Sequence, residues 1–240
     1  MESNGRRTLD DVIGRFSQLD WLSILRAVGL AVVAVFLVFL FLGISKLHAQ
    51  SLPPQGDFVA VQCGGQPATD PVGDATGCTG ASDVVGTTNR PAAYLVSDQS
   101  YLYVRIRLDG SPLQANAGLK NFGWGIEFDR DGDLTTYEHL GLIEGVGVPT
   151  ATIQKNTKIR LPNDPADPAE TTISKLGPVS SFWWSQAAGS NIGGDTDYFI
   201  TFALPWNTLA AEGYTRTDAV SLWLGSTNRT DALDGDIICG

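Results

Sequence analysis

The stretch FDRDGDLTTYEH, residues 128–139, places Asp129, Asp131 and Asp133 at alternate positions, with Gly132 before the last of them. Calcium in proteins takes several oxygen ligands, and alternate aspartates in a turn can turn their carboxylates toward one centre while a glycine permits the bend. A carbonyl such as that of Thr135 would add a further oxygen. The spacing therefore predicts a candidate calcium site made of Asp129, Asp131, Asp133 and Thr135.

Two departures weaken the match to an EF-hand loop. Gly132 occupies the fourth position instead of the sixth, and no glutamate stands at the twelfth. Glu138 is expected to lie already in the next strand. A plain hairpin connection, in which Asp and Gly serve only the turn, explains the same residues equally well. A second acidic group, Asp231, Asp234 and Asp236, would add to the site only if the C-terminal segment folds back to it.

Sequence motifs of catalysis are absent. The chain contains no GxSxG, HExxH, P-loop or GxGxxG pattern, and its only histidines are His48 and His139. The protein is therefore not expected to be an enzyme. A carboxylate-dependent hydrolase stays open as a last alternative, because the two acids of such a site are brought together by the fold and leave no local motif.

An uninterrupted apolar run, Ala27 to Ile44, lies between Arg26 and Lys46. Its length is close to the roughly 20 residues that cross a bilayer. The excess of arginine before the run places the N-terminus in the cytoplasm and the rest outside. We expect a cytoplasmic amphipathic segment at 1–26, a transmembrane helix in contact with lipid at 27–46, a linker at 47–56 and an extracytoplasmic domain at 57–240.

A cleaved signal peptide, cut after Ala49, is the competing interpretation. The apolar run is longer than the usual signal-peptide core of roughly 7–15 residues, which favours a retained anchor. The expected location is thus the cytoplasmic (inner) membrane, in a single pass, with the large domain in the periplasm or outside the cell.

The part that is expected to be exported is acidic and contains all three cysteines. The chain has 16 basic and 26 acidic residues, of which five and four lie in residues 1–50, so residues 51–240 carry a net charge of −11. Nucleic acid is not an expected partner of such an acidic domain. Cys63, Cys78 and Cys239 all follow the apolar run, where disulfides persist. Cys63 and Cys78 are neighbours along the chain, but three pairings remain open.

Period-two alternation predicts an antiparallel β-sandwich or barrel. In YLYVRIRL, residues 101–108, four aliphatic side chains alternate with tyrosine and arginine, as in a half-buried strand. Further strands are expected within 57–62, 92–96, 121–129, 137–145, 150–154, 180–186, 197–205 and 219–225. Pro205 and Gly213 bracket one short helix, and residues 161–171 are expected to be a solvated loop.

Three stretches, DQSYLYVRIRLDG, FDRDGD and DYFITFALPWNTL, resemble motifs of the family 9 carbohydrate-binding-module-like and DOMON-like β-sandwich domains. The resemblance spans most of residues 57–225. It implies an all-β ectodomain and brings sugar-binding and haem-binding relatives into consideration. Met/His haem ligation is not expected, because Met1 is the only methionine, and the apolar helix offers no pigment ligand. Trp183, Trp206 and Trp223, with Trp184 beside the first, are candidate glycan or partner contacts.

These observations favour a non-catalytic accessory or scaffold subunit, anchored in the membrane and contacting other membrane protein subunits through its sandwich. A respiratory or photosynthetic complex is one host that suits it. The alternative is a tethered carbohydrate-binding module that recognises a glycan through exposed tryptophans.

Overall fold

The computed structural model describes residues 51–74, 79–116, 118–133, 135–147, 149–176, 182–217 and 221–239. All of them belong to one compact unit, Gln50–Gly240. The amphipathic segment at 1–26 and the apolar helix at 27–46 lie outside the described residues. Within the described residues, no helix has the length and apolar character that crossing a membrane requires.

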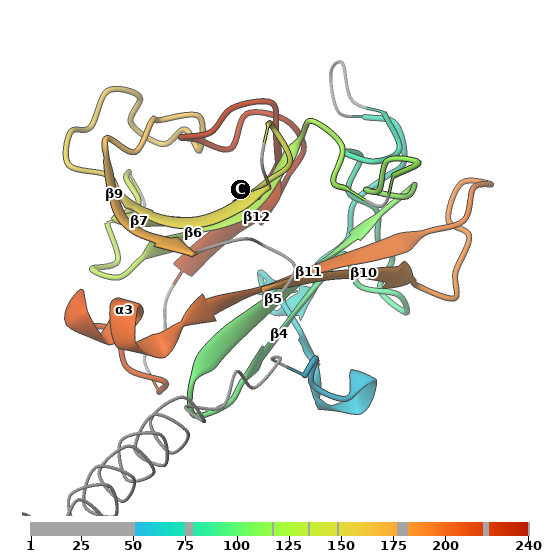
Figure 1. Ribbon diagram of the computed structural model, residues 1–240, viewed down its shortest axis with the longest axis horizontal. Helices are drawn as coiled ribbons and strands as arrows, with labels where there is room; N and C mark the ends of the chain where they lie inside the picture. Colours follow the sequence, from blue (N-terminus) through green and yellow to red (C-terminus); the bar gives the residue numbers. More distant parts are fainter. Residues whose placement is uncertain are drawn as a thin grey trace, which may run out of the picture. The chain divides into compact units, whose positions relative to one another are not determined.

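Two antiparallel sheets form a β-sandwich, which confirms the all-β prediction (Figure 1). The five-stranded sheet has the order β1-β4-β5-β11-β10, and the six-stranded sheet the order β13-β12-β6-β7-β8-β9. The first contains β1 (Val59–Ala60), β4 (Ala93–Ser97), β5 (Tyr101–Leu108), β10 (Trp183–Ala187) and β11 (Tyr198–Pro205). The second contains β6 (Gly123–Asp129), β7 (His139–Glu144), β8 (Thr150–Lys155), β9 (Thr171–Leu176), β12 (Ser221–Thr227) and β13 (Ile237–Ile238).

Three shorter elements complete the described fold. They are the two-stranded β2 (Gln62–Cys63) and β3 (Gln66–Pro67), the 3₁₀ turn η1 (Gln55–Asp57) and the helix α3 (Trp206–Ala211). The helix begins after Pro205 and ends before Gly213, which has a φ of 90°, as the sequence predicts. The predicted strand at 57–62 is split into β1 and β2. Strand β9 was not predicted, and it begins at Thr171, the last residue of the expected loop.

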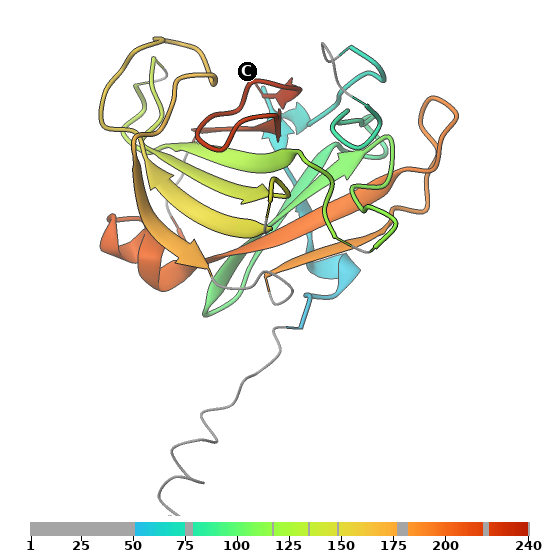
Figure 2. The same cartoon turned by 45° about the horizontal axis from the view of Figure 1, so that its top comes forward.

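The main core lies between the sheets and is built from the alternating apolar positions. Strands β5 and β11 contribute Val104, Ile106 and Phe202, and the facing sheet contributes Trp124 and Ile126, all fully buried. Each such side chain stabilises the fold by roughly 1.5–3 kcal/mol relative to exposure. Turning the molecule shows long connections, 156–170 and 228–236, over the outer face of the six-stranded sheet (Figure 2).

Strand β5 is more deeply buried than its alternation predicts. Arg105 and Arg107, expected on a solvated face, are 0% and 3% exposed. The guanidinium of Arg105 lies 3.5 Å from the centre of the Phe58 ring and 5.0 Å from that of Phe199. The expectation of a half-buried strand was wrong because the segment around Phe58 covers this face, which no local pattern announces.

Candidate functional site

The connection from β6 to β7 carries the predicted aspartates. Asp129 ends β6, and its Oδ1 accepts the Gly132 N–H at 2.9 Å. Asp131 Oδ1 accepts the Asp133 N–H at 2.8 Å. Gly132 has a φ of 79°, a conformation that glycine adopts without strain. These side-chain to backbone bonds close the loop, so the aspartates serve turn geometry in the described structure.

The carboxylates that meet are not all those that the sequence selected. Asp129, Asp131 and Glu138 each place a carboxylate oxygen within 4.8 Å of the other two. Asp133 instead accepts hydrogen bonds from the N–H and hydroxyl of Thr135, at 3.2 and 2.7 Å. The Thr135 carbonyl accepts the Asn163 N–H at 2.7 Å. The structure thus joins two of the four candidates to Glu138.

Glu138 joins this group because it precedes β7 instead of lying within it. Its Oε2 accepts the Arg130 N–H at 2.7 Å, which turns the side chain back over the loop. Burial, together with the nearby Asp131 and Asp129, raises the pKa of Glu138. The sequence predicted that Glu138 lies within the strand, whereas β7 begins one residue later, at His139. Sequence patterns do not place strand ends that closely.

The geometry suits a hard cation. Asp129 is 1% exposed, and its Oδ2 has no hydrogen-bond partner among the described residues. Carboxylate oxygens at this spacing are ligands that calcium prefers. Asp231 and Asp234 do not contribute, because Asp231 pairs with Arg229 at 2.9 Å and Asp234 accepts the Thr227 hydroxyl at 2.6 Å.

A polar network lies directly after the loop and was not predicted. His139 is buried, with Nδ1 2.8 Å from the Tyr214 hydroxyl and Nε2 3.2 Å from Glu212. Lys155 donates to the same Glu212 carboxylate at 2.8 Å. Burial lowers the pKa of His139, an effect that Glu212 opposes. Because both ring nitrogens have protein partners, this histidine ties β7 to the segment after α3.

A second group of carboxylates forms where the two ends of the domain meet. Asp236 lies with Asp70 and Asp74, each placing an oxygen within 4.8 Å of the others. The sequence predicted Asp236 only as an addition to the β6–β7 loop, and it did not single out Asp70 or Asp74. Their separation along the chain, 166 and 162 residues from Asp236, leaves no local signal.

The disulfide joins Cys63 to Cys239. Of the three open pairings, the structure therefore selects the one that connects the first strands to the last. Cys78 lies outside the described residues. The bond encloses 176 residues of sequence separation, so it constrains almost the whole domain.

The candidate tryptophans are half-buried. Trp183 and Trp206 pack against the main core, and Trp223 packs against a smaller cluster around Leu140 and Leu233. The Trp206 indole N–H donates to the Ser97 hydroxyl at 2.8 Å. None of the described large apolar side chains that are exposed is aromatic. The three residues are therefore only partly accessible, and their role in binding stays a prediction.

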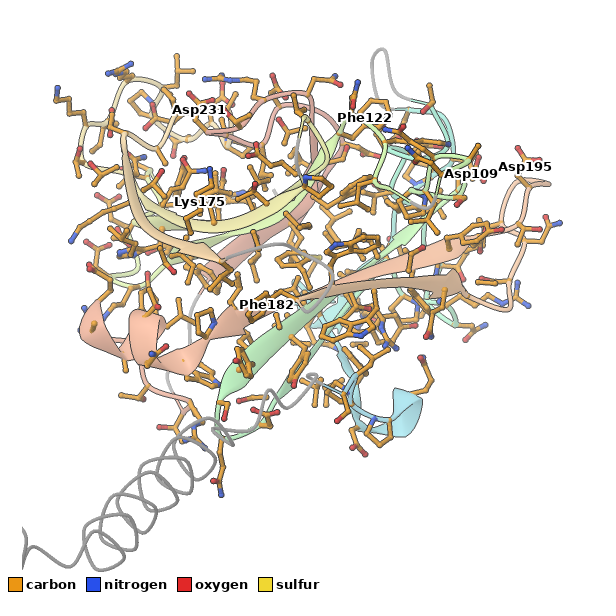
Figure 3. All side chains as sticks on the ribbon, viewed as in Figure 1. Asp109, Phe122, Lys175, Phe182, Asp195 and Asp231 are labelled. Carbon is orange, nitrogen blue, oxygen red and sulfur yellow. A yellow bond between two sulfur atoms is a disulfide. The ribbon has the colours of Figure 1, made fainter. Side chains whose placement is uncertain are left out.

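A second group of aromatic side chains forms a more continuous surface than Trp183, Trp206 and Trp223 do. We define the aromatic strip as Tyr94, Tyr101, Tyr103, Phe182 and Trp184, on the outer face of the five-stranded sheet. Ring centres are 6.2 Å apart for Tyr101–Tyr103, 6.1 Å for Tyr101–Phe182 and 6.1 Å for Tyr103–Trp184. Phe182 lies beside β11 (Figure 3). All members except the buried Tyr103 are half-buried, so the strip offers an apolar surface with polar edges.

One buried acid lies apart from both carboxylate groups. Glu127 on β6 is 0% exposed, and neither carboxylate oxygen has a hydrogen-bond partner among the described residues. Burial raises its pKa well above the ordinary value. The nearby Leu233 N–H donates to the Pro165 carbonyl at 3.1 Å. Glu127 therefore lies buried beneath the connections that cover this sheet, where burial favours its protonated form.

No protein-family model, no curated protein and no solved structure matches this chain. The resemblance to carbohydrate-binding-module-like and DOMON-like domains stays a prediction, and function rests on the residues themselves.

Proposed function

We propose that this protein is a non-catalytic accessory subunit that binds other membrane protein subunits through its β-sandwich. The observation that carries the proposal is the aromatic strip. Tyrosine and tryptophan dominate the energetics of protein contacts because they bury large apolar areas while keeping a polar group at the edge. The half-buried Tyr101 and Trp184 have this character.

The surroundings of the strip support this assignment. Leu52 and Phe58, from the segment that follows the predicted anchor, pack onto the same apolar cluster. Tyr103 donates its hydroxyl hydrogen bond to Asp98 at 2.9 Å, so its ring is held in place before a partner arrives. Preorganised side chains lose less conformational entropy on binding. The strip is thus a prepared contact surface beside the domain's N-terminal segment.

Calcium in the β6–β7 loop is a second part of the proposal. Asp129, Asp131 and Glu138 would hold the ion, and its role would be to stiffen the loop. The buried Oδ2 of Asp129 supports this set, because an unpaired buried carboxylate oxygen carries a desolvation cost that a cation removes.

The test is co-purification from native membranes. The full chain is extracted in mild detergent and analysed by size-exclusion chromatography with mass spectrometry. We expect wild-type protein to migrate with a defined set of membrane subunits, and Tyr101→Ser to reduce their recovery about tenfold, the loss that removal of an interface aromatic causes. Ile159→Ser is the control, because Ile159 is exposed at 55% and lies outside the strip.

Migration as a lone monomer would contradict the accessory-subunit proposal. Binding of an oligosaccharide on a glycan array, abolished by Trp184→Ser and retained by Ile159→Ser, would instead establish the carbohydrate-binding alternative. Aromatic platforms serve both kinds of ligand, so the two assays are run on the same variants.

A further inference from the structure

The carboxylates at the junction of the domain's two ends come from three separate segments. Asp70 and Asp74 follow β3, Asp83 precedes Val84, and Asp236 precedes β13. Oxygens of Asp70, Asp74 and Asp236 lie within 4.8 Å of one another. Calcium holds its ligands at 2.3–2.6 Å, so two oxygens on one ion can be up to about 5 Å apart. The spacing is therefore that of a single coordination shell.

Asp70, Asp83 and Asp236 are buried, whereas Asp74 is exposed, and not all of the buried oxygens are paired. Asp70, Asp83 and Asp236 are 8%, 4% and 5% exposed. Asp70 Oδ2 and Asp83 Oδ1 have no hydrogen-bond partner among the described residues. The Asp70 carboxylate faces that of Asp236, and burial together with this neighbour raises the pKa of Asp70. An unpaired oxygen on a buried carboxylate that belongs to a group of carboxylates is a position that a cation would stabilise.

Within the described part of the chain, no lysine, arginine or histidine forms an ion pair with the group. The ion pairs among the described residues are Arg107–Asp197, His139–Glu212, Lys155–Glu212, Arg160–Glu170 and Arg229–Asp231. The charges that act on Asp70 are those of Asp236, Asp74 and Asp83, and all of them raise its pKa. The sequence between Asp74 and Thr79 holds no lysine or arginine. Clustered buried carboxylates cost several kcal/mol per ion unless an opposite charge accompanies them.

Backbone contacts hold the carboxylates in place. The Val84 N–H donates to Asp236 Oδ2 at 2.5 Å, and the Gly73 N–H donates to Asp83 Oδ2 at 2.8 Å. The Ser226 hydroxyl donates to the Ser82 carbonyl at 2.5 Å, which fastens β12 to the same turn. These bonds position the segments independently of any ion, while Asp70 Oδ2 and Asp83 Oδ1 have no hydrogen-bond partner among the described residues.

We propose that Asp70, Asp74 and Asp236 bind one calcium ion, which fastens the C-terminal segment to residues 70–86. Asp83 stands beside Asp236 as the positioning residue of this site, through its bond to Gly73. The site is separate from the β6–β7 loop and does not depend on the partner-binding proposal. An ion here and the Cys63–Cys239 disulfide would secure the same end of the chain.

The test uses the full chain in detergent micelles, stripped of metal with a chelator. Calcium is titrated calorimetrically, and thermal unfolding is followed with and without 1 mM calcium, with magnesium as the comparison ion. The protein carries Asp131→Asn as a background, so that heat from the β6–β7 loop does not overlap. We expect calcium to raise the melting temperature by several degrees, and Asp70→Asn or Asp236→Asn to weaken its binding at least tenfold.

Metal-free protein gives a second signature. Without calcium, Asp70→Asn should melt above its parent, because it removes a repulsive buried carboxylate. With calcium, the order should reverse. Asp195→Asn is the matched control, because Asp195 is an exposed aspartate near Asp109 at the same end of the molecule (Figure 3), and it should change neither result.

Hydrogen exchange on the parent protein needs no variant in the site. Calcium should slow exchange of the Val84 amide and of the amides at 236–238. The proposal is overturned by unchanged exchange there, or by a full calcium response in Asp70→Asn and Asp236→Asn. It is also overturned by a magnesium response equal to that of calcium.

Discussion

The Cα atoms of Cys63 and Cys239 lie 5.1 Å apart, joined by a disulfide across 176 residues of sequence. This bond closes the domain between its first strands and its last. Cys63→Ser is expected to lower the free energy of unfolding by about 2–5 kcal/mol, because the unfolded chain gains the freedom of a very long loop. Denaturant unfolding of wild type and Cys63→Ser measures this difference in the free energy of unfolding.

Treatment with a reductant provides a control for the Cys63→Ser variant. Reductant should destabilise wild-type protein by a similar amount and leave Cys63→Ser unchanged. If reductant affects both proteins equally, the stabilising bond is not Cys63–Cys239.

The β6–β7 loop allows the two ligand sets to be compared. In an Asp236→Asn background, Asp131→Asn and Glu138→Gln should weaken calcium binding about tenfold or more, because each removes a charged oxygen from the group that the fold assembles. Asp133→Asn should weaken it less, since Asp133 is occupied by Thr135. Calorimetric titration ranks the variants, and a dominant effect of Asp133→Asn would restore the ligand set predicted from sequence.

Glu127 should make stability depend on pH. Its folded pKa is raised by burial, so the unfolded state ionises first as pH rises above the ordinary value. The stability that Glu127 contributes is then fully present at low pH and is lost as pH rises toward its folded pKa. Glu127→Gln should therefore be more stable than wild type at pH 8, by on the order of 1–3 kcal/mol, and the two should converge near pH 4.

The matched change for that experiment is Asp195→Asn, another carboxylate-to-amide substitution, at an exposed position. Asp195→Asn should leave the dependence of the unfolding free energy on pH close to that of wild type. A Glu127→Gln protein that parallels wild type from pH 4 to 8 would show that Glu127 ionises normally in the fold.

The planar guanidinium group of Arg105 is held in place by aromatic rings and a hydrogen bond. Its guanidinium lies between Phe58 and Phe199, and Nε donates to the Thr201 hydroxyl at 2.9 Å. Arg105→Lys keeps the charge but loses the stacking and the fixed donor, so it should destabilise the fold by about 1–2 kcal/mol. Arg216→Lys, at an exposed position, is the comparison. Equal unfolding midpoints for the two variants would contradict the role assigned to stacking.

Gly225 has no room for a side chain. A Cβ atom there would lie 2.2 Å from the Asp236 carbonyl oxygen, whereas one at Gly56 would meet nothing within 4 Å. Gly225→Ala should cost about 1–3 kcal/mol and should weaken calcium binding at the Asp70–Asp236 group, because β13 must shift. Gly56→Ala should do neither, and unfolding together with calcium titration follows both effects.

The sequence determined the elements whose signal is local. The alternation in 101–108 and 197–205 predicted two long strands, and Pro205 and Gly213 predicted the short helix that lies between these two residues. Both signals are local, because side-chain period and turn residues act over a few positions. The Asp-Gly loop after β6 was found for the same reason. Antiparallel all-β architecture follows from these parts once they must share one core.

Tertiary structure alone decided what meets across the chain. The folding of the two ends of the domain onto each other put Cys239 beside Cys63 and Asp236 beside Asp70, contacts that no short pattern encodes. It also buried Arg105 beneath Phe58 and turned Glu138 toward Asp131, reversing expectations drawn from alternation and strand limits. The physical reason is that burial and electrostatic pairing depend on distance in space, and a sandwich sets those distances only when its two sheets close.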